Sequence, residues 1–293
     1  MKRWISLILV LLLTFSGMVW AETDYTLPSG LVGGPEANPS CYTENGYEDE
    51  SLKVRIEKVF YDNVEVHLAW AEVKSPTQLR TAIMGTEKEP VAEGDAGVIV
   101  RANNAVIAIN GDMFTRRQGI IYRQGVPLKL TESPQKDALF IDENGDFHIF
   151  KGSNPAEMAA YLQTGHQIVN SFAFGPALVI NGEVQTIPSD YWFEPEGRCQ
   201  RTILAQIGPL SYLLVEVLGR TNDSRGFTMQ KAAEFMGTLG VQTAYNLDGG
   251  DSTVLYFGKT FYDKDFHYIG NGRKTSDIIY VCSAVDPATW KDR

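Results

Sequence analysis

Residues 202–218 read Thr-Ile-Leu-Ala-Gln-Ile-Gly-Pro-Leu-Ser-Tyr-Leu-Leu-Val-Glu-Val-Leu. Two apolar runs, residues 202–207 and 212–218, flank Gly208-Pro209, and a Gly-Pro pair marks a turn or loop. Short apolar runs bounded by turn residues are typical of strands that are buried in a sheet. This stretch therefore predicts two successive strands of a β-rich fold.

Similar runs recur on both sides of this stretch. Apolar positions at Val54, Ile56 and Val59 precede a turn signal at residues 61–63, and residues 64–70 then alternate between apolar and polar. This alternation predicts a hairpin with one buried face, with His67 on the solvated side. Further strands are expected at Ala105–Ile109, Ala138–Ile141, Phe147–Phe150, Ala177–Ile180, Val254–Phe257 and Ile278–Cys282.

Only two helices stand out. Asn154 is a suitable N-cap for the first, with Pro155 at its first position. Thr228 is a suitable N-cap for the second, which carries an apolar stripe and ends at Gly240. Since strands outnumber helices, the sequence predicts an α+β fold with a large, mostly antiparallel or mixed sheet and a few packed helices.

The N-terminus has a different composition. Lys2 and Arg3 precede an apolar run from Trp4 to Trp20, and the polar chain begins after Ala21. This pattern predicts a signal peptide over residues 1–21, and an uncleaved membrane anchor is the second interpretation. Residues 22–51, rich in Gly, Pro, Glu and Asn, are expected to form an irregular leader or linker. Residues 52–293 are expected to form a single domain.

Charge excludes one class of partner. Removing residues 1–21 takes away Lys2 and Arg3 and leaves 24 basic side chains against 36 acidic ones. A strongly acidic chain is a poor match for a nucleic-acid backbone. We expect a secreted or envelope protein, with no nucleic-acid partner and no membrane contact beyond the signal peptide.

The three cysteines, Cys41, Cys199 and Cys282, are far apart and form no CxxC pair. A zinc site built on them is therefore not expected. An exported protein would permit one disulfide, and the sequence does not choose the pair.

The strongest chemical signal is Asn246-Leu247-Asp248-Gly249-Gly250-Asp251-Ser252-Thr253. Two adjacent glycines free the backbone to approach a ligand, with carboxylates and hydroxyls beside them. Such a segment suits a sugar, a phosphate or a metal ion, although a tight turn capped by Asp side chains explains it equally well.

Three weaker clusters accompany it. Asn110-Gly111-Asp112-Met113-Phe114 follows a buried strand, at the kind of loop that carries binding residues. Arg201 begins another strand and Arg220 follows the next one, so the two guanidinium groups are candidates for a phosphate or carboxylate. Phe172 to Leu178 contain aromatics beside Gly175-Pro176, which suit either a sugar pocket or a core turn.

The order of these clusters resembles the phosphodiester glycosidase family, over roughly Ala105 to Val281. That family shows an N-G-x-F-F-like strand end, a G-P-x-L segment, R-T-x-x-G, D-G-R, a helix, N-L-D-G-G-G-S-S and a closing P-S-D-like strand. The corresponding residues here are Asn110–Phe114, Gly175–Gly182, Arg201-Thr202, Leu218-Gly219-Arg220, Gly226–Met229, Asn246–Thr253 and Thr275–Ile279.

This sequence departs from the pattern at three positions. Leu218 stands in place of the D-G-R aspartate, Asp251 in place of the third glycine, and Ala205 in place of the glycine after R-T-x-x. If that aspartate is essential, the chain is an altered or inactive relative, unless Asp251 and Glu216 compensate for it.

The resemblance implies hydrolysis of a sugar-1-phosphodiester. Because phosphate is a good leaving group, the reaction needs less help from a general acid than ordinary glycoside hydrolysis. Asp248 would act as nucleophile or base and Asp112 as the second carboxylate, while Arg201 and Arg220 would hold the departing charge. Replacing Arg201 with alanine is therefore expected to impair turnover far more than replacing Arg117.

The resemblance also implies a set of substrate-binding positions. Beyond the catalytic candidates Asp248, Asp112 and Arg201, these are Asn110, Gly111, Phe114, Gly175, Arg220, Thr228, Asn246, Gly249, Gly250, Asp251, Ser252, Thr253 and Asp277. The sequence identifies no certain cofactor, and a divalent cation such as Ca²⁺ or Mg²⁺ between Asp248 and Asp251 is a minor option.

Two other functions use similar features. A non-catalytic module that binds polysaccharide needs the same pocket but no positioned carboxylate. A phosphodiesterase would cut the P–O bond instead and release sugar-1-phosphate. The identity of the reaction products distinguishes these functions from a glycosidase that acts on a phosphorylated glycan or polysaccharide.

Overall fold

The computed structural model describes residues 33–220, 224–263 and 274–290. The expected signal peptide, residues 1–21, lies outside these ranges. Within them, no helix combines the length and the apolar composition that crossing a membrane requires.

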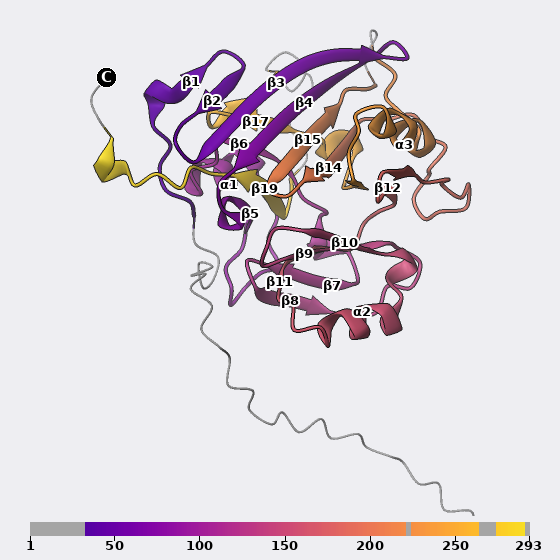
Figure 1. Ribbon diagram of the computed structural model, residues 1–293. Coiled ribbons are helices and arrows are strands. Elements are labelled where there is room, and N and C mark those ends of the chain that lie inside the picture. Colours follow the sequence, from indigo (N-terminus) through magenta and orange to yellow (C-terminus); the bar gives the residue numbers. More distant parts are fainter. Residues whose placement is uncertain (1–32, 221–223, 264–273, 291–293) are drawn as a thin grey trace, which may run out of the picture.

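The largest element is a nine-stranded sheet that crosses the upper part of the molecule (Figure 1). Its two longest strands, β3 and β4, form the hairpin expected from residues 54–70, and the hairpin predicted at 202–218 is β14 and β15. In spatial order the strands are β1 (Tyr42–Thr43), β2 (Gly46–Glu48), β3 (Leu52–Tyr61), β4 (Val64–Val73), β15 (Ser211–Val217), β14 (Arg201–Gly208), β16 (Thr243–Asn246), β12 (Ala177–Ile180) and β13 (Glu183–Val184).

The first two strands correct the expected leader. Residues 22–51 were expected to be irregular, yet β2 pairs with β3 and places Tyr47 opposite Val54. Tyr47 is buried, and its ring packs edge-on against Tyr42. The sheet therefore begins before residue 52, because two aromatic side chains in an otherwise polar stretch are enough to attach it to the core.

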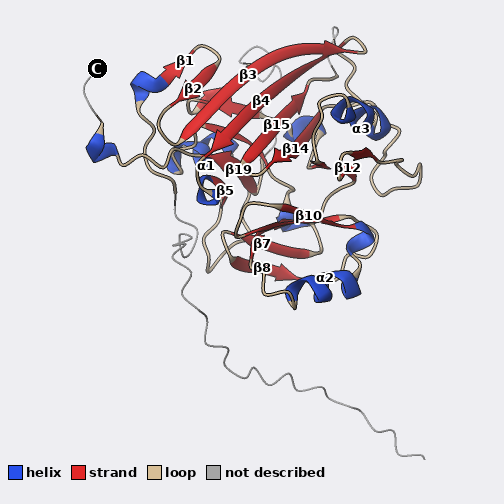
Figure 2. Ribbon diagram, viewed as in Figure 1, coloured by secondary structure: helices blue, strands red, loops and turns tan. Residues whose placement is uncertain are grey.

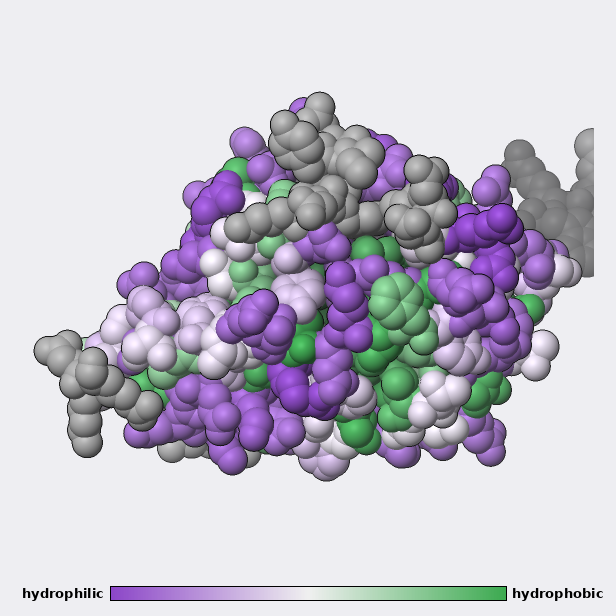
Figure 3. Space-filling view, turned by 90° about the horizontal axis from the view of Figure 1, so that it is seen from above, coloured by the Kyte–Doolittle hydropathy of each residue, from purple (hydrophilic) through white to green (hydrophobic). Residues whose placement is uncertain are grey.

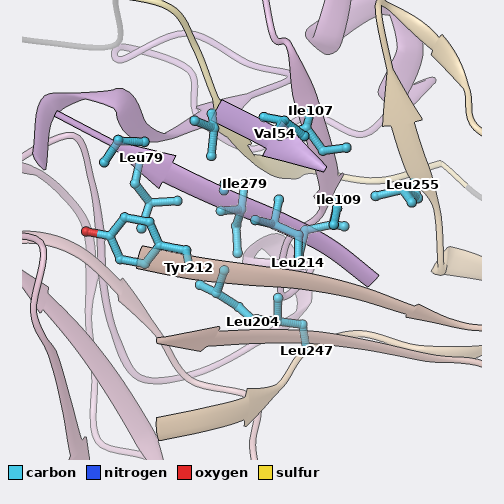
Figure 4. Packing of buried hydrophobic residues seen from close by; sticks show 14 of the residues in the cluster. Val54, Leu79, Ile107, Ile109, Leu204, Tyr212, Leu214, Leu247, Leu255 and Ile279 are labelled. Carbon is cyan, nitrogen blue, oxygen red and sulfur yellow. The ribbon is translucent and has the colours of Figure 1, made fainter. Parts of the chain in front are cut away.

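A second, five-stranded sheet packs against the first. Its strands, in order, are β18 (Thr260–Phe261), β17 (Leu255–Phe257), β6 (Ile107–Asn110), β19 (Asp277–Val281) and β5 (Leu79–Ile83). The facing side chains of the two sheets form one hydrophobic core, in which Ile109 and Ile279 meet Leu204 and Leu214 (Figure 4). Burial of apolar area on this scale is the main stabilising contribution in a domain of this size.

Helices cover the outer faces of both sheets (Figure 2). Helix α3 (Met229–Gly237) packs Phe235 and Met236 on the nine-stranded sheet, and α1 (Ala96–Ala102) packs Ile99 and Val100 on the five-stranded one. The described residues also contain six short 3-10 turns: η1 (Pro39–Cys41), η2 (Pro76–Gln78), η3 (Phe114–Arg116), η4 (Lys151–Ser153), η5 (Gly250–Ser252) and η6 (Pro287–Thr289).

A smaller lobe lies below the two sheets in Figure 1. It contains a three-stranded sheet and a two-stranded ribbon, with helix α2 packed against them through Met158. The strands are β10 (Phe147–Phe150), β9 (Ala138–Asp142) and β11 (Ile168–Phe172) in the sheet and β7 (Ile120–Arg123) and β8 (Val126–Leu130) in the ribbon, and the helix is α2 (Pro155–Leu162).

The α+β prediction is confirmed, and every strand pairing among the described residues is antiparallel. Both expected helices form with the expected N-caps, Asn154 and Thr228. Helix α1 was not predicted, because its seven residues are too few to show a clear period.

His67 was wrongly expected in solvent. It is fully buried, because both faces of β4 are covered, one by α3 and the other by the five-stranded sheet. Its imidazole lies between Glu216 and Glu65, at 2.8 and 3.0 Å. Period-2 alternation therefore indicated the right strand but the wrong environment for its polar face.

The three cysteines are all described and all free, so no disulfide joins them. Seen from above, the surface is mainly hydrophilic, with hydrophobic side chains visible between the polar ones (Figure 3).

Candidate functional site

Two loops from different sheets meet at the candidate site. Asp248 follows the end of β16 in the nine-stranded sheet, and Asp112 follows the end of β6 in the five-stranded one. The Asn110 side chain joins them, because its Nδ2 donates to the Asp248 carbonyl oxygen at 2.7 Å. The two motifs that lie 138 residues apart in sequence are therefore one structural unit.

The two asparagines of these motifs hold the backbone. The Oδ1 of Asn110 accepts from Thr202 Oγ1 at 2.7 Å and from the Val254 amide at 3.2 Å. Asn246 donates to the carbonyls of Gly175 and Leu247. Asn110, expected to contact substrate, is instead buried with its hydrogen-bonding groups bound to protein, so its role is positioning.

Asp248 is a buried carboxylate beside a cation. Its Oδ1 lies 3.4 Å from a guanidinium nitrogen of Arg117. The same guanidinium lies over the rings of Phe174 and Trp192, with its central carbon 4.8 and 5.1 Å from their centroids. Cation–π contact and a carboxylate together fix Arg117 in one orientation.

The aromatic side chains beside Arg117 form a wall, which we define as Phe174, Trp192 and Phe193. Trp192 donates its indole N–H to the Phe174 carbonyl at 2.8 Å and packs edge-on against its ring. A second cation, Lys136, lies 4.0 Å from the Trp192 ring centroid. Burial lowers the pKa of Lys136, and the positive charge of Arg117 lowers it further.

A lysine side chain holds the loop that carries Arg117. Lys129 on β8 donates to the carbonyls of Phe114 and Arg117, at 2.8 and 2.6 Å. Phe114 itself is buried in the lobe's core with Ile121, so it supports the loop rather than lining a pocket. Arg116, the neighbour of Arg117, points away and forms a two-pronged ion pair with Glu93.

Gly175 has a conformational reason to be glycine. Its φ is 71°, and a Cβ atom there would stand 2.3 Å from the Tyr191 hydroxyl. The absence of a side chain lets the chain turn between β11 and β12, which sets Phe174 beside Arg117.

A buried charge cluster lies behind Asp248. Arg123, at the end of β7, donates to Asp112 Oδ1 at 2.6 Å and to Asp277 Oδ2 at 2.7 Å, and all three side chains are fully buried. Gly111 makes room for it, because a Cβ there would collide with the Asp277 carboxylate at 1.9 Å. Burial raises the pKa of Asp112 to about 6, with Asp277 adding to the rise and Arg123 opposing it.

This arrangement places Asp112 and Asp277, expected as a catalytic and a substrate-binding residue, in the interior of the protein. Both oxygens of Asp112 are bound, one by Arg123 and the other by the Ala173 amide at 3.0 Å, and the residue has no exposed surface. Asp277 accepts from Arg123 and Ser276. Both carboxylates are therefore engaged within the protein and hold the loops around the site in place.

The two arginines expected to hold phosphate lie on the other side of the glycine pair. Arg201 is buried and donates to the carbonyls of Phe227 and Gly197, at 3.0 and 2.6 Å. Burial lowers the pKa of Arg201. These two contacts hold the Arg201 guanidinium against the backbone, and its catalytic role stays a prediction.

Arg220 and Asp251 are paired at the rim of the site. Arg220 donates to Asp251 Oδ1 at 3.1 Å, and both side chains are more than half exposed. Gly250, with φ 60°, lies under this pair, since a Cβ there would be 3.6 Å from the Arg220 guanidinium. A Cβ at Gly249 would stand 2.7 Å from the Gln200 carbonyl oxygen, so Gly249 is favoured by close backbone approach and Gly250 by its positive φ.

Two buried hydroxyls remain available. Ser252 Oγ and Thr253 Oγ1 have no hydrogen-bond partner among the described residues, and both side chains are buried. Thr228, by contrast, accepts from the Lys231 amide as the N-cap of α3, so its hydroxyl is already engaged within the protein.

The positions of the two carboxylates do not support a divalent cation between Asp248 and Asp251. Each carboxylate already faces an arginine, Arg117 or Arg220. The groups of three metal-ligating side chains found among the described residues lie elsewhere.

Glu216 does not replace the aspartate missing at Leu218. Its carboxylate is fully buried and bonded to His67 Nδ1 at 2.8 Å. Leu218 is itself buried, and its carbonyl accepts from Ser224.

The residues that sequence reasoning missed are mainly cations and one aromatic. Arg117, Lys136 and Trp192 belong to no motif, and each becomes visible only through its neighbours in space. Position after a strand end was the one available signal for Arg117, which follows the Asn110–Phe114 segment closely.

Comparisons with known proteins identify a family and a shared fold. Residues 103–282, more than half of the chain, match the family described as phosphodiester glycosidase. The catalytic domain of zebrafish N-acetylglucosamine-1-phosphodiester alpha-N-acetylglucosaminidase, described as auto-inhibited by its pro-peptide, has a similar fold. The TM-score is 0.63 and the identity 17%, over 85% of this chain and 87% of the other.

A hypothetical protein from Synechocystis shares the fold as well. Its TM-score is 0.56 and its identity 14%, over 79% of this chain and 62% of the other. No curated protein matches the sequence significantly.

Proposed function

The chain belongs to the phosphodiester glycosidase family, and we propose that it hydrolyses a sugar-1-phosphodiester at the Asp248 loop. The observation that carries this proposal is the pairing of a buried carboxylate with a guanidinium that lies on an aromatic wall. A carboxylate can act at an anomeric carbon, a cation can bind a phosphate, and an aromatic ring can pack on the face of a sugar.

The reaction breaks the bond between C1 and the bridging oxygen. Water supplies the new C1–O bond, and the phosphate departs with the electron pair of the broken bond. The phosphate needs little protonation as it leaves, since its conjugate acid is strong. Asp248 either takes the proton of the attacking water or attacks C1 itself, and the anomeric configuration of the released sugar distinguishes the two routes.

Arg117 is the proposed holder of the departing charge. Its guanidinium lies in a largely buried environment, in which a fixed positive charge stabilises developing negative charge more strongly than in water. Lys136, beside the Trp192 ring, adds a second positive charge on the same side.

The aromatic wall of Phe174, Trp192 and Phe193 is the proposed sugar platform. Aromatic rings offer a flat apolar face to the C–H face of a sugar ring. Ser252 and Thr253 would bind hydroxyl or phosphate oxygens, because each hydroxyl is buried and has no partner among the described residues.

The substrate is proposed to be a phosphorylated glycan or polysaccharide outside the cytoplasm. This rests on the basic and apolar residues of the N-terminal segment, which suit export. A polysaccharide-binding module is the second candidate, and it is favoured by one observation, the replacement of the family's D-G-R aspartate by Leu218.

Product analysis in H₂¹⁸O tests the proposal. The purified protein is incubated with a small panel of sugar-1-phosphodiesters, beginning with α-N-acetylglucosamine-1-phosphomethyl ester. Label in the free sugar supports the glycosidase, and label in the phosphate with sugar-1-phosphate as product contradicts it. Binding with no turnover on any substrate favours the module.

A further inference from the structure

One cation at the candidate site has no anionic partner among the described residues. The Lys136 ammonium lies 4.0 Å from the Trp192 ring centroid and forms no ion pair with a described carboxylate. The other two lysines of the small lobe are engaged, since Lys129 donates to two backbone carbonyls and Lys151 lies 3.1 Å from Asp137 Oδ2. The charge of Lys136 is therefore not neutralised within the part of the protein that the structure describes.

Arg117 differs from Lys136 in this respect. Its guanidinium already faces the Asp248 carboxylate, at 3.4 Å. Because these two charges oppose each other, Lys136 supplies the uncompensated positive charge beside the aromatic wall. A phosphodiester carries one negative charge that could meet it, whereas a neutral glycoside carries none.

The surroundings of Lys136 disfavour an isolated positive charge. The side chain is half-buried, and burial lowers its pKa, with the positive charge of Arg117 lowering it further. The contact with the Trp192 ring attracts the ammonium but does not neutralise it. A bound anion would offset both effects on the pKa, since an opposite charge at contact distance favours the charged form.

Two hydrogen bonds hold the Lys136 segment beside Trp192. Ser153 Oγ donates to the Lys136 carbonyl at 2.8 Å, and the Asp137 amide donates to the Tyr191 hydroxyl at 2.9 Å. They attach this segment to η4 on one side and to the neighbour of Trp192 on the other. The backbone of Lys136 is therefore held close to the aromatic wall, which limits where its ammonium can lie.

The charge of the whole chain makes such a local cation necessary for an anionic ligand. The sequence has 36 acidic side chains against 26 basic ones. An acidic protein repels anions at long range, so a phosphate that binds to it needs fixed positive charge at the binding place.

We propose that Lys136 binds the non-bridging phosphate oxygens of the substrate and thereby selects a phosphodiester over a neutral ligand of the same shape. This inference rests on the proposed function of the Asp248 loop. Arg117 acts on the charge that develops as the bond breaks, whereas Lys136 acts on the charge that the substrate already carries. Loss of Lys136 therefore weakens binding more than it slows bond cleavage.

Binding of dimethyl phosphate tests this inference without turnover. The ligand has the charge of a phosphodiester but no sugar, so the proposed reaction cannot cleave it. Calorimetric titration of the whole protein at constant ionic strength should show saturable binding. Neutral trimethyl phosphate should bind about tenfold or more weakly, because it makes no charge-assisted hydrogen bond. Absence of saturable binding, or equal binding of the two ligands, would overturn the inference.

Variants assign the binding to Lys136. Lys136→Met should weaken dimethyl phosphate binding about tenfold or more and remove the preference over trimethyl phosphate. Lys136→Arg, which keeps the charge, should retain most of the affinity. Unchanged affinity in Lys136→Met would contradict the assignment.

Lys231→Met is the matched control. Lys231 also lies near an aromatic ring, 5.9 Å from the Tyr61 centroid, but its ammonium is paired with Glu234 at 2.7 Å. This variant should bind dimethyl phosphate as the wild-type protein does. A loss equal to that of Lys136→Met would reveal a general effect of surface charge and would overturn the specific role of Lys136.

Kinetics on a hydrolysed sugar-1-phosphodiester separate binding from cleavage. Lys136→Met should raise KM by about tenfold or more with little change in kcat, because it removes an interaction that is present before the bond breaks. A fall in kcat with unchanged KM would contradict the binding role. If Lys136-dependent phosphate binding is found but no diester is hydrolysed, the proposed hydrolase function fails and the phosphate-binding role of Lys136 stands.

Discussion

Arg117 joins the two parts of the candidate site, the Asp248 carboxylate and the aromatic wall. Its guanidinium contacts the Asp248 carboxylate and lies on the aromatic wall, while Lys129 holds its backbone. Removing it takes away the charge next to the reacting bond and leaves the fold's hydrophobic cores intact. Its neighbour Arg116 has the same chemistry but is bound to Glu93 at the surface.

Arg117→Ala should lower kcat/KM by about 10²- to 10³-fold, the usual cost of losing one fixed group that stabilises transition-state charge. Arg116→Ala should change it by less than about threefold, since exposed ion pairs contribute little. Steady-state kinetics on a cleaved phosphodiester measures both. Equal losses in the two variants would contradict the role of Arg117.

Sequence reasoning at this scale found the carboxylate and missed its partners. Asp248 was singled out because two glycines and two carboxylates share one loop, although a tight turn capped by Asp side chains explained that loop equally well. Arg117 and Trp192 were not, since their importance comes from contacts between segments about 75 residues apart along the chain. Arg201 stood at a predicted strand start, but burial bound it to backbone carbonyls.

The pairing of β4 with β15 carries a buried ionic contact. His67 on β4 lies opposite Glu216 on β15, and Glu65 holds its second nitrogen. Burial alone would lower the pKa of His67, but the hydrogen bonds and charges of the two carboxylates outweigh it and raise the pKa above the ordinary value. The protonated imidazole therefore links the two strands.

This contact predicts a pH-dependent stability. Because the folded pKa of His67 is raised, its stabilising contribution is complete below pH 6.5 and is lost as the pH rises through the folded value. Urea unfolding of wild type and His67→Gln from pH 6 to 9 should show a stability difference that shrinks with increasing pH. A difference that is constant, or that grows with pH, would contradict the account.

Elements themselves were largely predictable. Local chemistry predicts the N-caps Asn154 and Thr228. It also predicts the turn at Asp62-Asn63, where both residues have positive φ. The burial of both faces of β4 was not predictable, because the strands that cover its second face come much later in the chain.

Across the whole molecule, one buried arginine connects the small lobe to the large sheets. Arg123 ends β7, whereas Asp112 follows β6 and Asp277 begins β19. A buried ion pair adds little net stability over an apolar alternative, but removing one partner leaves charge without compensation. The connection is therefore costly to break.

Arg123→Leu should lower the free energy of unfolding by about 3–5 kcal/mol, since it leaves two buried carboxylates facing each other. Arg116→Leu, which breaks an exposed pair, should cost about 1 kcal/mol or less. Urea denaturation followed by circular dichroism measures both values. Similar losses of unfolding free energy in the two variants would show that Arg123 does not join the small lobe to the large sheets.

The fold class followed from the sequence, but only ten of the nineteen described strands were predicted, and their order in space was not. Strand β4 lies beside β15, and β6 lies between β17 and β19, because apolar faces match across the core. No local signal encodes such pairings between distant segments. The meeting of the Asp112 and Asp248 loops, and with it the site, depends on this order.

The most direct test compares Asp248→Asn with Asp251→Asn on a sugar-1-phosphodiester that the wild-type protein hydrolyses. The two aspartates share one loop, but Asp248 is buried beside Arg117 and Asp251 is exposed at the rim. Asp248→Asn should lose at least about 10³-fold in kcat while Asp251→Asn stays within about fivefold of wild type. Retained turnover in Asp248→Asn would contradict the central claim that this carboxylate acts at the anomeric carbon.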